Sequence, residues 1–444
     1  MLLSPSIRLR AIIAASVRVC IMAAIVIHAA PHATADTTPE RAIHIIAGYP
    51  DFEIVESAPI ETSLDHADIR NAEAVWLEMI QSAKTSLDFA EFYASEDPND
   101  ANDPIDKILA AIEEAADRGV KVRFVSSSTF YKTYPQIVDR LRESIGDGAS
   151  PNCASEGRGV LLLDFKAVAG GVLHAKYFIV DGETVYLGSQ NFDWRAFSHI
   201  QELGVRIHDR AVAAAMMAIY DTDWFTALTQ AKVQMECVVP SVREDFPIVK
   251  EMAPGETALV TPVASPRNFL PGGVPWDEPR LVAMIDSAKT SVVVQLLTYK
   301  PMSGGEYYEA LDGALQRAAA RGVNVRLLCA DWCKRPSTIP HLKTLAVVPN
   351  FEVKMITFPE WSGGFIPFAR VIHSKYMVVD GRASWIGTSN WERDYFYESR
   401  NVGVTVESEK IGGILDRFFA SGWESEYAYR VDPAVEYAPP RISE

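Results

Sequence analysis

The chain has 444 residues, is 48% hydrophobic and carries a formal net charge of −16. This length allows two or three domains of ordinary size, and the composition excludes a collagen-like, low-complexity or charge-blocked chain. A chain this acidic is not expected to bind nucleic acid through bulk electrostatics, although a locally basic pocket can still hold a phosphate group.

Residues 1–35 are predicted to form a secretory signal peptide. Arg8 and Arg10 supply a positive start, residues 19–30 form an apolar run without a charge, and Ala33-Thr34-Ala35 supplies small residues for cleavage. The protein is therefore expected to be secreted or periplasmic. The apolar run is shorter than the roughly 20 residues of a membrane span, but extending it back through Arg18 leaves an N-terminal signal anchor as the alternative.

The rest of the chain contains a duplication with a period of about 200 residues. The segment SAKTS at 82–86 recurs at 287–291, and RGVKVR at 118–123 recurs as RGVNVR at 321–326. We therefore expect a first domain over residues 36–239 and a second over 281–444. Residues 240–280, which are rich in proline, are expected to form a connector and the first edge strand of the second half.

Each half is predicted to alternate helices with strands. The apolar spacing predicts helices at 72–83 and 105–118 and strands at 86–93 and 120–125 in the first half, then helices at 281–288 and 307–321 and strands at 291–297 and 323–329 in the second. This order favours an α/β fold of two duplicated, layered domains with mixed, partly parallel sheets. Residues 331–370 are expected to be a long irregular stretch that either shapes a substrate channel or is a surface insertion.

Four cysteines remain if the signal is removed. An oxidising compartment would permit a disulfide between Cys329 and Cys333 or between Cys153 and Cys237, and the sequence does not fix the pairing. The C-x3-C spacing is a weak metal signature because no second ligand pair stands at a fitting distance, so no metal site is predicted.

The strongest signal is the motif H-x-K-x4-D-G-x5-G-[ST]-x-N, which occurs twice at corresponding places in the duplication. In a strand, His174 and Lys176 point to the same side, Asp181 and Gly182 form a hairpin turn, and Asn191 follows the returning strand. His373, Lys375, Asp380 and Asn390 occupy the same positions in the second copy.

These residue types suit cleavage of a phosphodiester. Two lysines and two asparagines can hold the phosphate oxygens and the charge that grows on them in the transition state. Two histidines suit a two-step displacement in which one attacks phosphorus and the other donates a proton to the leaving alcohol. Each copy supplies one histidine, so the two copies are predicted to make one site, with no metal or cofactor required.

Other residues are expected to support the motif. Strand alternation places Asp181 and Asp380 opposite the histidines, which favours a role in the turns, with a direct catalytic role as the alternative. Glu202 and Glu398 follow the motifs and are predicted to orient the imidazoles through their second nitrogens, with Ser189 and Ser389 beside them.

The double motif resembles the HKD signature of the phospholipase D superfamily. This resemblance implies two α/β domains related by a pseudo-twofold axis with one active site between them. It also implies that His174 is the nucleophile, that His373 is the general acid and base, and that Lys176, Lys375, Asn191 and Asn390 bind the phosphate.

Further segments resemble one branch of that superfamily, which contains the animal lysosomal phospholipase-D-like 5′ exonucleases and poxvirus envelope phospholipase-like proteins. The segments are IVESAP at 54–59, LGSQNFDWR at 187–195 and IGTSNW at 386–391. The resemblance implies single-stranded nucleic acid or a phospholipid as the substrate, and a membrane anchor in the animal members.

The predicted function is hydrolysis of a phosphodiester, in a phospholipid headgroup or in single-stranded nucleic acid, through a phosphohistidine. Two alternatives are a phosphatidyl transferase with an alcohol acceptor and a non-catalytic protein that binds phosphate or lipid. Stacking of bases would use Phe192, Trp194, Trp361 or Trp391, although aromatics beside a motif more often belong to the core. Peripheral membrane contact would use residues 361–368, and no protein partner is implied.

Overall fold

The computed structural model describes residues 47–100, 103–233 and 240–443, and the predicted signal peptide lies outside them. The described residues belong to one compact unit in which each half of the duplication supplies one large sheet. In the described part of the chain, no helix combines the length and the apolar composition needed to cross a membrane.

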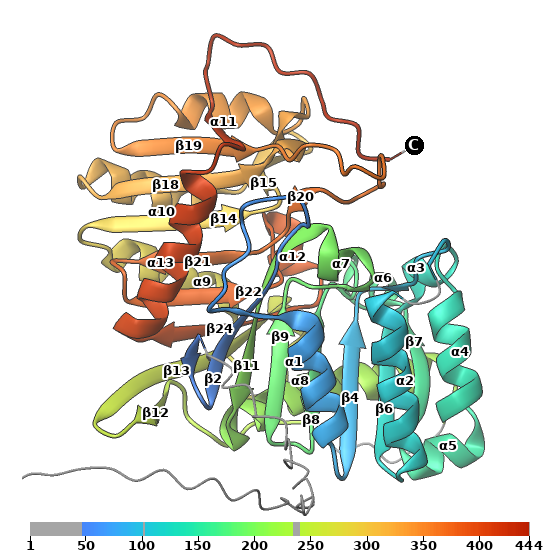
Figure 1. Cartoon of the computed structure of the whole chain (residues 1–444). Helices are drawn as coiled ribbons and strands as arrows, with labels where there is room; N and C mark the ends of the chain where they lie inside the picture. The colour runs from blue at the N-terminus through green and yellow to red at the C-terminus, as the bar shows by residue number, and fades with distance from the viewer. Residues whose placement is uncertain (1–46, 101–102, 234–239, 444) are drawn as a thin grey trace, which may run out of the picture. The chain divides into compact units, whose positions relative to one another are not determined.

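The first sheet has the central order β2-β11-β9-β8-β4-β6-β7 (Figure 1). β4 runs parallel to β6, and β6 runs parallel to β7, whereas the remaining neighbours in this order are antiparallel. The strands are β2 (Phe52–Ser57), β4 (Ser86–Glu91), β6 (Lys121–Ser127), β7 (Gly159–Leu163), β8 (Lys176–Val180), β9 (Thr184–Gly188) and β11 (Ile200–His208).

The second sheet repeats this order as β13-β24-β22-β21-β14-β18-β19, with β12 and β25 added at its edges. The duplicated, mixed α/β fold expected from the sequence is therefore confirmed. The strands are β12 (Ile248–Ala253), β13 (Glu256–Ser265), β14 (Ser291–Leu296), β18 (Asn324–Ala330), β19 (Phe351–Ile356), β21 (Tyr376–Val379), β22 (Ala383–Gly387), β24 (Asn401–Glu407) and β25 (Ala428–Arg430).

Helices cover both faces of each sheet. The outer face of the first sheet packs on α1 (Ala72–Ser82), α2 (Pro104–Asp117) and α4 (Gln136–Ile145), and that of the second on α9 (Asp277–Ser287), α10 (Glu309–Ala320) and α11 (Ile339–Leu345). The inner faces of both sheets share one core with α8 (Arg210–Gln230) and α13 (Glu409–Trp423). Because this core contains residues from both halves, the halves are held together by apolar burial.

Four of the helices, α1, α2, α8 and α13, begin where the sequence supplies a capping side chain. Asn71, Asp103, Asp209 and Ser408 each accept hydrogen bonds from backbone N–H groups in the first turn of the helix that follows. Such caps satisfy donors that have no partner within the helix.

The stretch 331–370 is more regular than expected, because it contains α11 and β19, which repeat α4 and β7 of the first half. Its apolar residues lie on one side of a short helix and in one short strand, so the periodic signal is weak. Cys329 and Cys333, one of the two pairs that the sequence left open, are buried and unbridged, and Cys153 is also free. Cys237, the other member of the Cys153 pair, lies outside the described residues.

Candidate active site

The two motifs meet because each is hydrogen-bonded to the opposite half. The backbone N–H of His373 donates to the carbonyl of Gln201 in β11 at 2.8 Å, and that of His174 donates to the carbonyl of Arg400 at 2.9 Å. Strand β20 (Val371–Ile372), directly before His373, pairs with β11 in parallel. The crossed pairing places both histidines at the junction of the two sheets.

The partner of each imidazole also comes from the opposite half. Glu202 of β11 accepts a hydrogen bond from Nδ1 of His373, with distances of 2.8 and 2.9 Å to its two oxygens. Asn401 of β24 lies 2.9 Å from Nδ1 of His174 through its Oδ1. One histidine therefore faces a carboxylate and the other a neutral amide.

The orientation of the Asn401 amide fixes the proton on His174. Its Nδ2 donates to the carbonyls of Tyr395 and Ser399, so its Oδ1 is the atom that faces the imidazole. An amide oxygen only accepts hydrogen bonds, so Nδ1 of His174 carries the proton. The lone pair of His174 is consequently on Nε2, the nitrogen that a nucleophile in this position needs.

Lys176 and Lys375 are both buried and both donate to the backbone carbonyl of the histidine two residues earlier. Burial lowers the pKa of Lys176 well below its usual value, and the charge of Lys375 lowers it further. Burial lowers the pKa of Lys375 to about 7, although the Glu202 carboxylate opposes this shift. Two ammonium groups in one buried site favour an anionic ligand that would compensate both charges.

The two imidazoles are held in their neutral forms by their surroundings. Burial lowers the pKa of both histidines well below 6.5, and the charges of Lys176 and Lys375 act in the same direction on each. The pKa of Glu202 is raised to about 7 by burial, with opposing effects from Lys375 and from a hydrogen bond of Ser189. The site thus combines neutral imidazoles, two lysines and a buried carboxyl group.

The two motif asparagines are buried next to these groups. Asn390 donates to the Tyr395 hydroxyl at 3.2 Å, and Oδ1 of Asn191 has no hydrogen-bond partner among the described residues. The Tyr395 ring also packs edge-on against His174, with 4.9 Å between centroids. The structure therefore brings histidine, lysine and asparagine of both motifs into one neighbourhood, as the sequence predicted.

Asp181 and Asp380 make their contacts elsewhere. Asp181 accepts hydrogen bonds from the backbone of residues 84–86 and from the Thr85 hydroxyl, and Asp380 does the same with residues 289–291 and Thr290. Each aspartate joins its hairpin to the loop between a helix and a strand. These contacts agree with the turn role, and none of them supports the catalytic role.

Two of the residues predicted to support the histidines do not make the expected contacts. Glu398 pairs with Arg393 at the surface and contacts neither histidine, and the Ser389 hydroxyl is buried without a hydrogen-bond partner in the described structure. Thr388 and Asn401 take these positions, and the Thr388 hydroxyl donates to Asn401 Oδ1 at 2.9 Å. Residue spacing would have found Asn401, because Glu202 and Asn401 both stand 28 positions after their motif histidines. The prediction failed because it looked for a second glutamate.

Sequence reasoning also missed Glu91. This residue ends β4 opposite Lys176 in the antiparallel register, is fully buried, and has no hydrogen-bond partner for either carboxylate oxygen among the described residues. Burial raises the pKa of Glu91 well above its usual value, and the charge of Lys176 opposes this rise. The only sequence signal would have been its place in the register beside Lys176.

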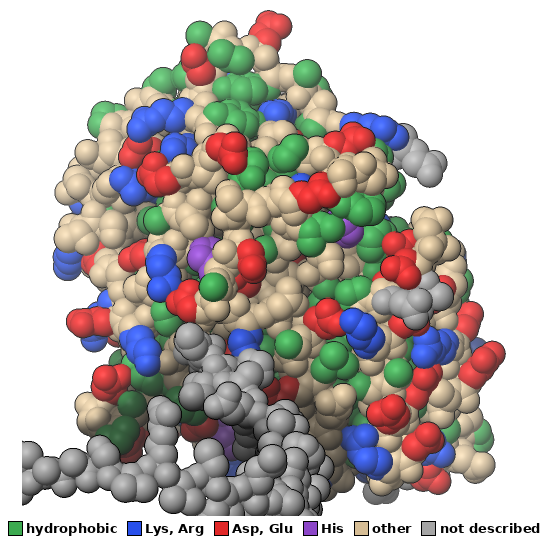
Figure 2. All heavy atoms as spheres, in the orientation of Figure 1, with side chains coloured by type: hydrophobic (Ala, Val, Ile, Leu, Met, Phe, Trp, Pro, Cys, Tyr) green, Lys and Arg blue, Asp and Glu red, His purple; other side chains and the backbone are tan. Residues whose placement is uncertain are grey.

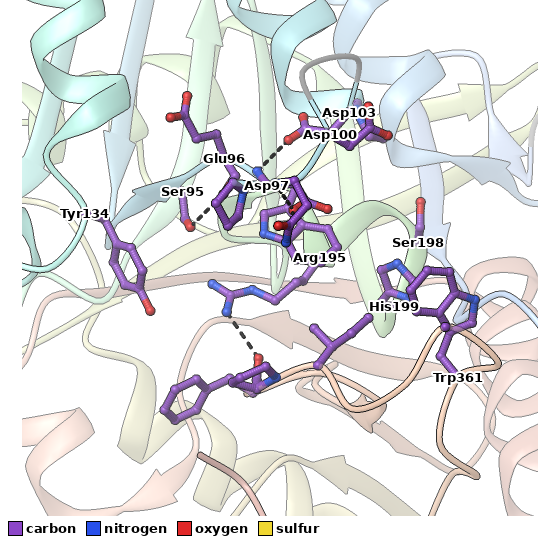
Figure 3. A pocket seen from close by; sticks show the side chains of 18 of the residues that line it. Ser95, Glu96, Asp97, Asp100, Asp103, Tyr134, Arg195, Ser198, His199 and Trp361 are labelled. Carbon is purple, nitrogen blue, oxygen red and sulfur yellow. Dashed lines mark hydrogen bonds between the residues drawn. The ribbon is translucent and has the colours of Figure 1, made fainter. Parts of the chain in front are cut away.

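A cavity of about 1140 Å³ lies between the loop after β5 (Ala94–Ser95), α7 (Arg195–Ser198) and residues 361–368, and its described lining contains no histidine, lysine or asparagine of the two motifs (Figure 3). Trp194 and Trp361 line it, whereas Phe192 and Trp391 are buried in the core. Of the four aromatics named as candidates for stacking, Trp194 and Trp361 are therefore the two that line this cavity.

Comparison with known proteins agrees with this geometry. The family model described as "Cardiolipin synthase, PLD-like domain" matches residues 76–224 and 281–423. The "5'-3' exonuclease PLD3" of Rattus norvegicus is 30% identical over 410 residues, covering 86% of this chain and 81% of that protein. "Phospholipase D Z" of Dictyostelium discoideum is 28% identical over 408 residues, covering 85% and 90%.

A solved structure shows the same fold. Phosphatidylserine synthase of Haemophilus influenzae superimposes with a TM-score of 0.54 at 11% identity, covering 82% of this chain and 85% of that one. The duplicated family match, the relatives that span most of the chain and the joined HKD motifs lead to one conclusion: the chain belongs to the phospholipase-D-like family and is a phosphodiesterase.

Proposed function

We propose that this protein hydrolyses single-stranded nucleic acid from its 5′ end, through a phosphohistidine on His174. The observation that carries the assignment of roles is the asymmetry of the two imidazole partners, the Asn401 amide on His174 and the Glu202 carboxylate on His373. An amide supports a neutral imidazole, while a carboxylate stabilises an imidazolium.

In the first step, the substrate phosphate is held by the ammonium groups of Lys176 and Lys375 and by the amides of Asn191 and Asn390. Nε2 of His174 attacks phosphorus and forms an N–P bond as the P–O bond to the leaving alcohol breaks. The bound phosphodiester anion offsets the lysine charges that keep His373 neutral in the empty site, so in the complex His373 is the imidazolium, and its Nε2 gives a proton to the departing oxygen. The added charge on the phosphate oxygens is balanced by the two lysines.

In the second step, His373, now neutral, takes a proton from a water molecule. The water oxygen attacks phosphorus, the N–P bond breaks, and His174 is restored with a phosphomonoester as the product. Glu202 stabilises the imidazolium of His373 that this step regenerates.

Nucleic acid is proposed as the substrate because relatives at about 30% identity across most of the chain are 5'-3' exonucleases by name. The protein does not need a basic surface for this, because the phosphate is bound inside. On the face shown in Figure 2, basic and acidic side chains are interspersed, and the described residues form no basic stripe there.

The test is to trap the intermediate. Purified protein is mixed with single-stranded DNA labelled at either end, in the presence of a chelator, and quenched within one turnover. We expect label to be attached to the wild-type protein and to accumulate in His373→Ala, because loss of the general base slows hydrolysis of the intermediate. His174→Ala should bind no label and lose at least about 1000-fold in rate.

Trapped label in His174→Ala, or turnover unchanged by that substitution, would overturn the mechanism. Loss of activity in the chelator would contradict a mechanism that uses the two lysines alone as the positive charges. Cleavage of phosphatidylcholine vesicles without cleavage of either DNA would replace nucleic acid by phospholipid as the substrate.

A further inference from the structure

The cavity lined by Trp194 and Trp361 has a wall made of three aromatic rings. The ring of His199 stands edge-on to Trp194, with 5.4 Å between centroids, and edge-on to Trp361, with 5.0 Å. Trp194 and Trp361 are only half-buried, so part of each indole faces the cavity. Figure 3 shows Trp361 and His199 side by side, with Tyr134 on the other side of Arg195.

The charges around the cavity disfavour a phosphate group as its ligand. Glu96 and Asp97 line it, and among its described lining residues the only guanidinium belongs to Arg195, which is already paired with Asp193. A phosphate would meet these carboxylates without a free cation to compensate its charge.

Arg195 also contacts the aromatic wall. Its guanidinium lies 5.8 Å from the centre of the Trp194 ring and 5.9 Å from that of Tyr134, and its charge is compensated by Asp193. Burial and the charge of Arg370 lower the pKa of His199 to about 4, so that ring is uncharged at neutral pH. The wall therefore presents uncharged aromatic faces that suit a flat ligand.

One residue of the wall, His199, lies close in sequence to Glu202. His199 directly precedes β11, and Glu202, the partner of His373, is three residues further on. At about 3.3 Å per residue, roughly 10 Å of chain separates the two positions. One or two nucleotides of an extended strand would span that distance.

We propose that this cavity is a nucleobase subsite, in which a base of the single-stranded substrate stacks on Trp194 and Trp361 while its phosphodiester lies at the histidine pair. The inference rests on the proposed function and adds where the substrate is recognised. A base is flat and uncharged, and every base has a face that can stack, so the subsite would select for nucleic acid without selecting a sequence.

The experiment compares oligonucleotides that differ by one missing base. Single-stranded DNA with an abasic nucleotide at the first, second or third position from the 5′ end is compared with the intact oligonucleotide. For the wild-type protein we expect kcat/KM to fall by roughly tenfold or more when the stacked base is missing. Trp361→Ala and Trp194→Ala should bring the ratio of kcat/KM for the intact oligonucleotide to kcat/KM for the abasic one towards one. Trp361→Phe should restore most of the wild-type ratio.

Tyr307→Ala is the matched control, because Tyr307 is a 45% exposed aromatic residue that does not line this cavity. It should keep the wild-type ratio. Thermal unfolding of every variant checks that the fold is intact.

A wild-type protein that cleaves DNA with equal kcat/KM whichever base is missing would overturn the subsite and leave the proposed function standing. A wild-type protein that cleaves no oligonucleotide would instead overturn the proposed function. An unchanged ratio in both tryptophan variants, with loss of phosphatidylcholine hydrolysis from vesicles, would assign the cavity to a lipid headgroup.

Discussion

The two imidazoles of the site differ in the one residue that each contacts through Nδ1. Glu202 and Asn401 occupy equivalent places in the duplication, and each acts on the histidine of the other half. The duplication therefore gives each histidine a similar hydrogen bond, but the partner is a carboxylate for His373 and a neutral amide for His174. This difference of one carboxylate is the basis for the separate roles proposed for the two copies of the motif.

The first prediction at this scale concerns Glu202→Gln. Burial and nearby lysines already lower the pKa of His373. The Glu202 carboxylate, 2.8 Å from Nδ1, favours the imidazolium form as any adjacent negative charge does. Removing the negative charge should lower the pKa of His373 further, so the alkaline limb of kcat/KM should move to lower pH. The rate at neutral pH should fall at least about tenfold for each pKa unit. A pH–rate profile measures both effects.

Glu398→Gln is the control for this substitution, because Glu398 pairs with Arg393 at the surface. Its profile should match the wild type. An equal shift in the two variants would show that a change of net charge, and not the contact with His373, moves the limb.

The opposite change is expected for Asn401→Asp. A carboxylate at this position would stabilise the imidazolium of His174 and raise its pKa, so the nucleophile would be protonated over a wider range. The acid limb of kcat/KM should move to higher pH. Isotope-edited NMR of His174 would follow the same pKa directly, and an unchanged value would refute the role given to the amide.

At the scale of elements, the two aspartates of the motif hold the hairpins that carry the histidines and lysines. Asp181 and Asp380 both have positive φ, 55° and 53°, a conformation in which aspartate and asparagine are better tolerated than most residues. Each carboxylate accepts three backbone N–H groups from a loop about 90 residues or more away in sequence. The hairpin is thereby fixed to the strand β4 or β14 beside it.

Asp380→Asn is expected to destabilise the protein by about 1–3 kcal/mol, since the bonds to a charged acceptor are replaced by weaker ones. Burial alone would raise the pKa of Asp380, but the backbone N–H groups outweigh it and lower the pKa. A lowered pKa means that this stabilisation is complete above the pKa of the unfolded chain and is lost as the pH falls through the folded value. The wild type and the variant should therefore converge in unfolding free energy at acidic pH.

Denaturant unfolding at several pH values measures this, with kcat recorded under conditions where the variant is folded. Loss of more than 100-fold in kcat in a fully folded Asp380→Asn would restore the catalytic role for this aspartate. Asp181→Asn should behave in the same way, because its contacts are the same.

The elements of the fold could be predicted where the sequence is periodic. The helices at 72–83 and 105–118 and the strands after them were found within a few residues, because α1 and α2 bury one regular face. Residues 331–370 could not be assigned in this way, because α11 has only seven residues and β19 six. The cavity could not be predicted from the sequence, because Trp194 and Trp361 are 167 positions apart and each contacts the ring of His199 that lies between them.

At the scale of the whole molecule, the two halves are tied by a buried ion pair next to the active site. Arg400 stands directly before β24, and Asp223 belongs to α8. Both side chains are fully buried, and the Arg400 guanidinium donates several hydrogen bonds to the Asp223 carboxylate. The backbone carbonyl of Arg400 accepts the N–H of His174, and its side chain also donates to the carbonyl of Ser265. The contact between the halves and the position of His174, the proposed nucleophile, thus both involve Arg400.

Asp223→Ala should leave the Arg400 guanidinium buried without its carboxylate, which typically costs about 3–5 kcal/mol in unfolding free energy. It should also lower kcat in the protein that stays folded, because the strand segment that positions His174 loses an anchor.

The paired change Asp223→Leu with Arg400→Met removes both charges, so it should recover much of the stability, since replacing a buried ion pair by apolar residues is often close to neutral. If the pair only held the halves together, the double variant would recover kcat as well. We expect kcat to stay reduced, because the bond from the Arg400 side chain to Ser265 is lost with the guanidinium. Thermal unfolding and kcat measured on the wild type, Asp223→Ala and the double variant separate these two outcomes. Full recovery of kcat in the double variant would show that Arg400 acts on the proposed nucleophile only through the joining of the halves.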